Sequence, residues 1–159
     1  VLLLSIGIWF VVVFSARVAI WGNPLYLHVV GADETLRNQV EHIMSQEAAS
    51  ATDDEVHFLQ RFSRLTVLEL IMFLLEVGLL TYLWLTDILV WLAIALLVKD
   101  LVLVALSAAM ARAGSGEGGV FQSLLALPSW LIWTDRISAL VSAFGFLAFF
   151  LEINGLQPW

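Results

Sequence analysis

The residues of this chain that could carry chemistry are ionisable side chains inside or at the edges of apolar stretches. They are Arg17, Glu69, Glu76, Lys99, Asp100, Asp135, Arg136 and Glu152. A charge at the bilayer centre costs roughly 3 kcal/mol on insertion scales, so such residues normally face a bundle interior and have partners. Carboxylates and ammonium groups placed there can pass protons or ions, or can hold helices in register as buried pairs.

Glu76 and Lys99 are the two residues whose positions along the chain predict a contact. They flank the short turn at Thr86-Asp87, at similar separations on either side. With a rise of 1.5 Å per residue, antiparallel helices joined by that turn place them at depths that differ by about 3 Å. We therefore expect a Glu76–Lys99 ion pair near mid-membrane. Glu69 lies two helical turns from Glu76 on the same face, where we expect it to meet Arg17 or Arg136.

The acids in this set outnumber the bases, so at least one carboxylate is expected to lack a basic partner. Asp100 is the candidate, because it projects about 100° around the helix from Lys99. Structural pairing, which fixes register and mates neighbouring subunits, is the favoured interpretation of the cluster. A path for protons or ions is the second interpretation, and contact with lipid or a cofactor is the third.

The composition excludes several classes of protein. The 159 residues are 61% hydrophobic and only 13% charged, whereas a soluble domain is about half apolar and a quarter charged. An ordinary soluble enzyme and a disordered chain are thus excluded. The net charge of −7 repels phosphate backbones, so we expect no nucleic acid partner. The absence of Cys excludes thiolate chemistry, disulfides and Cys-ligated metal clusters.

The apolar stretches that must position these charges predict an all-α polytopic membrane protein. A helix needs about 20 apolar residues to span the bilayer. We place transmembrane helices at 1–22, 65–85, 88–110 and 135–155. The chain starts at Val1 rather than Met, so we expect residues upstream of it.

The last apolar block, 120–153, is too long for one span, and Pro128 with the Asp135-Arg136 pair divides it. A short interfacial helix is therefore expected at 121–134, with aromatic residues suited to the headgroup region. A Gly-rich segment at 111–120 is expected to be a flexible linker.

The polar segment 23–64 is predicted to be amphipathic and helical. Gly22-Asn23-Pro24 ends the first span. A helix capped by Asp33 follows, with apolar residues at helical spacing: Leu36, Val40, Ile43 and Met44. Thr52-Asp53-Asp54-Glu55 matches a capping box, and no breaker follows before Leu85. Residues 52–64 are thus expected to form a stalk continuous with the second span, docked through Val56, Leu59 and Phe62.

The basic residues outside the apolar core set the predicted orientation. With four spans, the polar segment and the linker share one side, which carries Arg37, Arg61, Arg64 and Arg112, while the opposite side has no Lys or Arg. The positive-inside rule places the polar segment in the cytoplasm or its equivalent. A bacterial inner membrane is favoured over an organelle.

Small residues form two candidate seams for helix packing. Ser138, Ser142 and Gly145 line one face of the last span, and Ala105 and Ala109 line one face of the third. Such seams let helices approach closely in lipid. Packing within the chain and contact with another subunit are equally good interpretations.

Histidine positions and sequence motifs give no cofactor or metal site. His28, His42 and His57 lie outside the predicted spans, so His ligation of haem or chlorophyll at mid-membrane is not expected. Asp54-x-x-His57 is a single carboxylate–histidine motif, whereas di-metal carboxylate sites need two and further Glu ligands. Nucleotide-binding, P-loop, nucleophile-elbow and zincin motifs are absent. No cofactor is predicted, and lipid or pigment contact stays open.

These observations favour a non-catalytic, accessory or structural subunit of a larger membrane complex. Its expected partners are other integral membrane subunits and the lipid bilayer, with a homo-oligomer as an option. The alternative is a small channel or transport subunit that conducts ions or protons through the buried carboxylates and Lys99. A membrane enzyme that uses Asp54, His57 or Glu41 is the least favoured hypothesis.

Overall fold

The computed structural model describes residues 2–45, 52–113 and 128–156, in which helices are joined by short turns and no strand occurs. The helices are α1 (Leu2–Trp21), α2 (Pro24–Val30), α3 (Glu34–Ser45), α4 (Asp53–Leu85), α5 (Val90–Ala113) and α7 (Ser129–Ile153). The all-α prediction is confirmed. Within these ranges, three segments are long and apolar enough to cross a membrane: Leu2–Val30, Asp53–Leu85 and Ser129–Ile153. They indicate an integral membrane protein.

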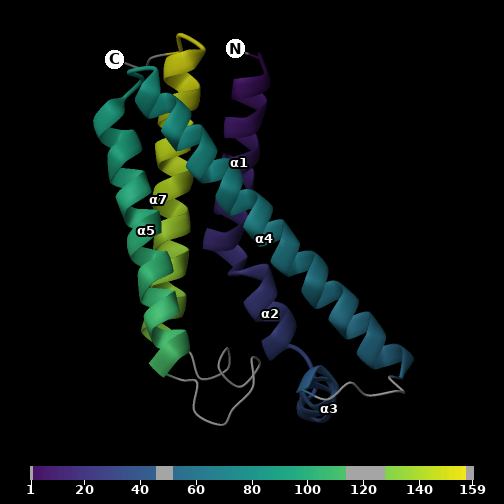
Figure 1. Cartoon of the computed structure of the whole chain (residues 1–159). Helices are drawn as coiled ribbons and strands as arrows, with labels where there is room; N and C mark the ends of the chain where they lie inside the picture. The colour runs from purple at the N-terminus through teal and green to yellow at the C-terminus, as the bar shows by residue number, and fades with distance from the viewer. Residues whose placement is uncertain (1, 46–51, 114–127, 157–159) are drawn as a thin grey trace.

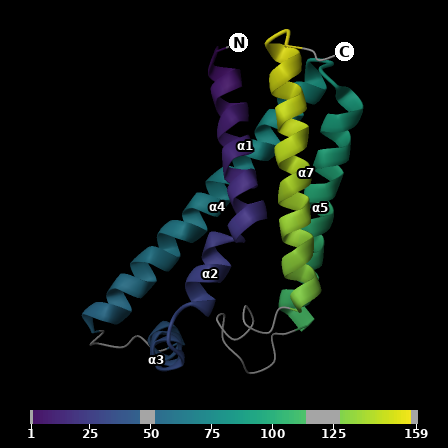
Figure 2. The same cartoon turned by 180° about the vertical axis from the view of Figure 1, so that it is seen from behind.

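Helices α1, α5 and α7 run side by side, and α4 crosses them at an angle (Figure 1). Seen from behind, α7 lies between α1 and α5, on the face opposite α4 (Figure 2). Their common core is apolar and consists of Ile8, Val11, Met72, Leu80, Leu83, Ala93, Leu96, Phe146 and Phe149. Large apolar side chains also cover the outside of the bundle, as Trp91 does with 84% exposure. An apolar exterior is what a bilayer requires of a helix bundle.

The junction between α1 and α2 is built by Gly22, Asn23 and Pro24. Gly22 has a φ of 93°, a left-handed conformation that favours glycine. The Asn23 side chain accepts hydrogen bonds from the backbone N–H groups of Leu25 (2.9 Å) and Tyr26 (3.1 Å), which caps α2. The predicted end of the first apolar helix is confirmed.

A second, smaller apolar cluster joins α2, α3 and the first turns of α4, which together we call the polar unit. Its buried residues are Val29, Val40 and Phe58, with Ala32, Leu36, Leu59 and Phe62 packed against them. The His28 ring stacks on Phe58 with 4.5 Å between ring centroids. At the start of α4, the Thr52 backbone N–H donates to Glu55 Oε2 at 2.6 Å. The predicted capping box and the unbroken stalk are therefore confirmed.

The docked face of the stalk differs from the predicted one. Phe58 is 5% exposed, whereas Val56 is 38% exposed and lies outside the cluster. Leu59 and Phe62 are partly buried in this contact, as expected for docked residues. The i, i+3, i+6 series from Val56 drifts off the buried face because an α-helix has 3.6 residues per turn. The stripe Phe58–Leu59–Phe62 follows i, i+1, i+4 and stays on that face.

Phe58→Asp should detach α2 and α3 from α4, because it places a carboxylate in an apolar cluster. We expect limited proteolysis to cleave the polar unit several-fold faster in this variant than in the native chain. Val56→Asp is the matched control, with the same change on an exposed position of the same helix. Equal cleavage of the two variants would contradict the observed docking.

The predicted division of the last apolar block at Asp135-Arg136 is wrong, because α7 is one helix that begins at Ser129. Residues 129–134, assigned to a separate interfacial helix, form the first turns of α7, and Asp135-Arg136 lies within the helix rather than before it. Pro128 precedes the first turn, where its missing N–H costs nothing. A charged pair does not break a helix, so no boundary forms there. The rest of that prediction, 121–127, lies outside the described residues.

The turn between α4 and α5 and the end of α5 differ slightly from the predicted boundaries. Asp87 and Leu89 adopt positive φ values of 58° and 45°, and α5 begins at Val90 rather than at residue 88. Helix α5 continues to Ala113, so 111–113 belong to it rather than to the predicted linker. The remaining linker residues, 114–120, lie outside the described part of the chain.

Candidate functional site

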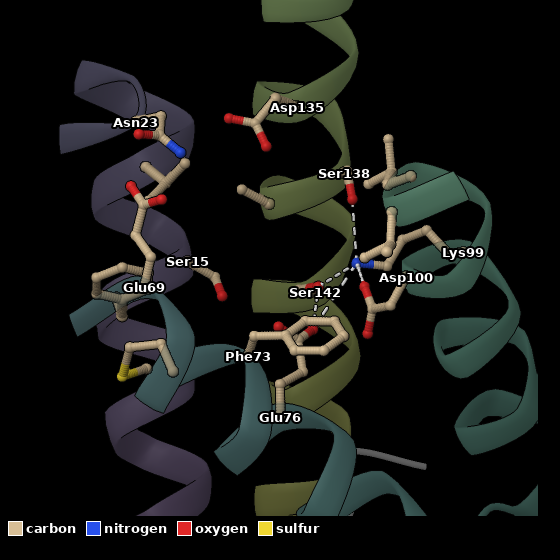
Figure 3. Close-up of a pocket in the computed structure, with 16 residues that line it drawn as sticks. Ser15, Asn23, Glu69, Phe73, Glu76, Lys99, Asp100, Asp135, Ser138 and Ser142 are labelled. Carbon is tan, nitrogen blue, oxygen red and sulfur yellow. Dashed lines mark hydrogen bonds and ion pairs between the residues drawn. The ribbon is translucent and has the colours of Figure 1, made fainter. Parts of the chain in front are cut away.

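A polar cavity of about 380 Å³ lies between α1, α4, α5 and α7. Among the described residues that line it are four carboxylates and one ammonium group, with neutral polar side chains between them (Figure 3). We call it the acidic cavity, and its polar lining is Ser15, Asn23, Glu69, Glu76, Lys99, Asp100, Asp135, Ser138 and Ser142. Phe14, Phe73 and other apolar residues complete the walls.

Lys99 is the centre of a hydrogen-bonded group on one side of this cavity. Its Nζ lies 2.6 Å from Asp100 Oδ1 and 3.7 Å from Glu76 Oε1. The ammonium also donates to Ser138 Oγ at 3.0 Å and to Ser142 Oγ at 2.6 Å. Ser142 Oγ in turn donates to Glu76 Oε1 at 2.6 Å. The cation is therefore held by α4, α5 and α7 together.

The contact between Glu76 and Lys99 occurs in the structure, as the matched depths predicted, but the prediction for Asp100 is wrong. Asp100 was expected to lack a basic partner, and it forms the shorter of the two contacts with Lys99. The four-carbon stem of lysine is flexible enough to bring its ammonium to the neighbouring side chain. The other carboxylate oxygen, Asp100 Oδ2, is buried and has no hydrogen-bond partner in the described structure.

Glu69 and Asp135 form the other part of the acidic cavity. Glu69 Oε1 accepts a hydrogen bond of 3.4 Å from the backbone N–H of Leu25. Figure 3 shows Glu69 directed toward Asn23, with Asp135 on the facing helix α7. These two carboxylates thus lie near the junction of α1 and α2, toward the end of the bundle that carries the polar unit.

The expected contact of Glu69 with Arg17 or Arg136 is not formed in the described residues. Arg136 Nη2 instead donates to the Trp21 carbonyl at 3.4 Å, and its guanidinium lies 5.5 Å from the centre of the Trp133 ring. Arg17 lines a different cavity. Side-chain direction around the helix decides these contacts, and depth alone does not give it. The last member of the predicted charge set, Glu152, lies near the end of α7, away from the acidic cavity.

The Ser138–Ser142–Gly145 seam packs inside the chain against α5. Ser142 is 1% exposed, and a Cβ at Gly145 would lie only 2.6 Å from Leu96 Cδ1. Ala105 and Ala109 of α5 are exposed, so they face away from this contact. Sequence reasoning identified the two serines as packing residues and missed their role as ligands of Lys99. The i, i+4 spacing of these serines, which places both on one helix face, was the sequence signal that could have indicated this role.

Ser15 and Asn23 also line the acidic cavity and were not predicted as site residues. Asn23 was identified only as part of a turn. In the described residues, no group of three or more His, Asp or Glu side chains is arranged to hold a metal ion. The side chain of His42 lies outside the described residues, and His28 is engaged with Phe58.

No family model, curated protein or solved structure matches the chain. A functional proposal therefore depends on the chemistry of the acidic cavity.

Proposed function

We propose that the chain is an integral membrane protein of four transmembrane helices, α1, α4, α5 and α7, whose acidic cavity transfers protons. The observation that carries this proposal is the imbalance of ionisable groups around one cavity. Four carboxylates and one ammonium would give four negative charges and one positive charge, a net charge of −3. Such a charge is costly in a low-dielectric interior, and proton binding to the carboxylates relieves it.

Helix α5 supports the proposal of a fourth span. It has 24 residues, and apolar side chains such as Leu101 and Val102 are exposed on its outer face. With α5 as a span, the polar unit and the C-terminal end of α5 lie on one side of the membrane. Arg37, Arg61 and Arg64 are on that side, which we propose to be cytoplasmic by the positive-inside rule.

The arrangement of the carboxylates provides a series of proton-binding groups. Glu69 and Asp135 lie toward the polar unit, and Glu76, which is two helical turns from Glu69 along α4, lies with Asp100 further along the bundle (Figure 3). Glu69 and Glu76 are separated by a helical rise of about 10 Å. Water in a polar cavity of this size can bridge such a separation by hydrogen bonds. Asp100 Oδ2, buried without a partner, is an acceptor for a proton or a water molecule.

Lys99 has a distinct part in this proposal. It keeps Glu76 and Asp100 close together without supplying enough positive charge to neutralise every carboxylate of the cavity. Ser142 connects Glu76 to the ammonium, so a proton that binds at Glu76 changes the hydrogen bonding of the whole group. Proton binding would therefore be shared by the group rather than confined to one residue.

Proton uptake into liposomes tests this function. The purified chain is reconstituted with a pH-sensitive dye inside, and a potassium gradient with valinomycin supplies the driving force. We expect the native chain to acidify the interior. Glu76→Gln and Asp100→Asn should lower the initial rate at least fivefold, because each removes a proton-binding carboxylate.

Asp53→Asn is the matched control, because it makes the same carboxylate-to-amide change on an exposed residue at the start of α4. This variant should keep the native rate. A native rate equal to that of empty liposomes would overturn the proposal, as would sodium uptake without proton uptake.

A non-catalytic accessory subunit of a larger membrane complex is the second proposal. The exposed positions Ala105 and Ala109 favour it, since two small residues spaced by four allow a helix of another membrane subunit to approach α5. Stoichiometric companion polypeptides that stay with the chain in mild detergent would support this role. A chain that migrates alone and conducts protons would contradict it.

A further inference from the structure

A second cavity, of about 500 Å³, lies where the polar unit meets the helix bundle. It is bounded by α1, α2 and α4, with a contribution from the start of α3. Two of its lining residues carry guanidinium groups, Arg17 and Arg61, and a third is His28. The rest are apolar or small, and none is acidic: Pro24, Leu27, Gly31, Ala32, Leu36, Phe58 and Leu65. We call it the basic cavity.

The two guanidinium groups of the basic cavity are available to a ligand. Arg17 and Arg61 are both exposed, and neither forms an ion pair in the described structure. Arg37 of the same unit behaves differently, since its Nη1 donates to the carbonyls of Val29 (3.1 Å) and Ala32 (2.8 Å). Two guanidinium groups that line one cavity, with no carboxylate among its described lining residues, favour an anion that can accept charge-assisted hydrogen bonds.

The position of this cavity relative to the membrane identifies the class of anion. Arg17 precedes the end of α1 by one helical turn, and Arg61 precedes Leu65, where the apolar part of α4 begins. Both are therefore at headgroup depth in a chain that spans the bilayer. Outside the cavity, Val13 and Ile20 of α1 expose apolar side chains. An anion that combines a phosphate with acyl chains satisfies both the guanidinium groups and this apolar surface.

We infer that the basic cavity binds the phosphate of an anionic lipid headgroup through Arg17 and Arg61. Basic pockets between membrane helices on the cytoplasmic side attract such lipids. The acyl chains of the lipid would lie along the exposed apolar side of α1. A free phosphate offers the same anion without the acyl chains, so the two sources can be separated by experiment.

Lipid retention tests this inference. The chain is reconstituted in nanodiscs of phosphatidylcholine with a minor share of phosphatidylglycerol, extracted into mild detergent, and analysed by native mass spectrometry. We expect the native chain to retain phosphatidylglycerol selectively. Arg17→Gln and Arg61→Gln should each lower that retention about tenfold, in line with the loss of a hydrogen bond to a charged group.

Arg64→Gln is the matched control, because it removes the same charge from an exposed position of α4 that does not line the cavity. It should retain phosphatidylglycerol as the native chain does. Arg17→Lys, which keeps the charge, should restore most of the retention lost in Arg17→Gln, and this separates ligand binding from a folding defect. Equal retention by all variants would overturn the inference. If inorganic phosphate displaces phosphatidylglycerol, the inference of a lipid ligand is wrong, and the cavity binds a free anion instead.

Discussion

Lys99→Met is expected to lower the free energy of unfolding by about 3–5 kcal/mol, the usual cost of stranding buried charges. The substitution leaves Glu76 and Asp100 facing one another without the cation that contacts both of them. Ser138 and Ser142 lose their donor at the same time. Unfolding in mixed micelles of mild detergent and dodecyl sulfate, followed by tryptophan fluorescence, measures the change.

The companion variants distinguish a three-residue group from a simple ion pair. Glu76→Gln should cost less than Lys99→Met, because Asp100 still accepts from the ammonium at 2.6 Å. A simple pair predicts that removing both Glu76 and Lys99 restores stability. The structure predicts only partial recovery, because Asp100 stays stranded, and full recovery when Asp100→Asn is added. Arg64→Met, which removes an exposed cation, is the control. A Lys99→Met variant as stable as the native chain would contradict the observed group.

Gly145→Leu is expected to destabilise the bundle by about 2–3 kcal/mol, the range for overpacking a filled core. A Cβ at this position would lie 2.6 Å from Leu96 Cδ1, and Leu96 is itself 2% exposed. Phe146 and Phe149 fill the surrounding core, so Leu96 has little room to move. Helix α5 would have to separate from α7, which would also pull Lys99 away from Ser142. The same micelle titration measures the loss.

Gly78→Leu is the matched control for this substitution. Gly78 lies in α4, and no heavy atom is within 4 Å of a Cβ built on it, so no loss is expected. The contact itself is checked by adding Leu96→Ala to Gly145→Leu. The double variant should be more stable than the sum of the two single changes predicts, because the smaller side chain makes room for the larger one. Strict additivity would show that the two residues do not oppose each other.

The parts of the fold that could be predicted are those decided locally by the chain. The capping box at Thr52 and the lack of a breaker before Leu85 predicted α4 correctly, since helix propagation depends on neighbouring residues. The start of α7 could not be predicted as well, because Pro128 can end one helix or open another. The charges of Asp135-Arg136 resembled a boundary, but their burial is decided by neighbouring helices rather than by their own segment.

In the site, the depths of the charged residues could be predicted from the sequence, whereas the directions of their side chains could not. The short turn after α4 fixed the depths of Glu76 and Lys99, because both are counted from it at a constant rise per residue. The partners around Lys99 depend on how α7 is rotated and where it packs, and nothing in the order of residues 128–145 sets that rotation relative to α5. Ser138, Ser142 and the direction of Asp100 were therefore beyond sequence reasoning. Glu69 reached Leu25 and the α1–α2 junction for the same reason.

The 33 residues of α4 form one continuous helix of about 50 Å, which leaves the bundle at an angle and ends in the polar unit (Figure 1). A continuous helix of this length transmits a tilt of its outer end to the residues inside the bundle. Phe58, which anchors the outer end, lies about 27 Å along the axis from Glu76. Any load that tilts the outer end moves Glu69 and Glu76 together relative to Lys99, which belongs to α5. The distance between Glu76 and Lys99 should therefore change when a force on the polar unit tilts α4.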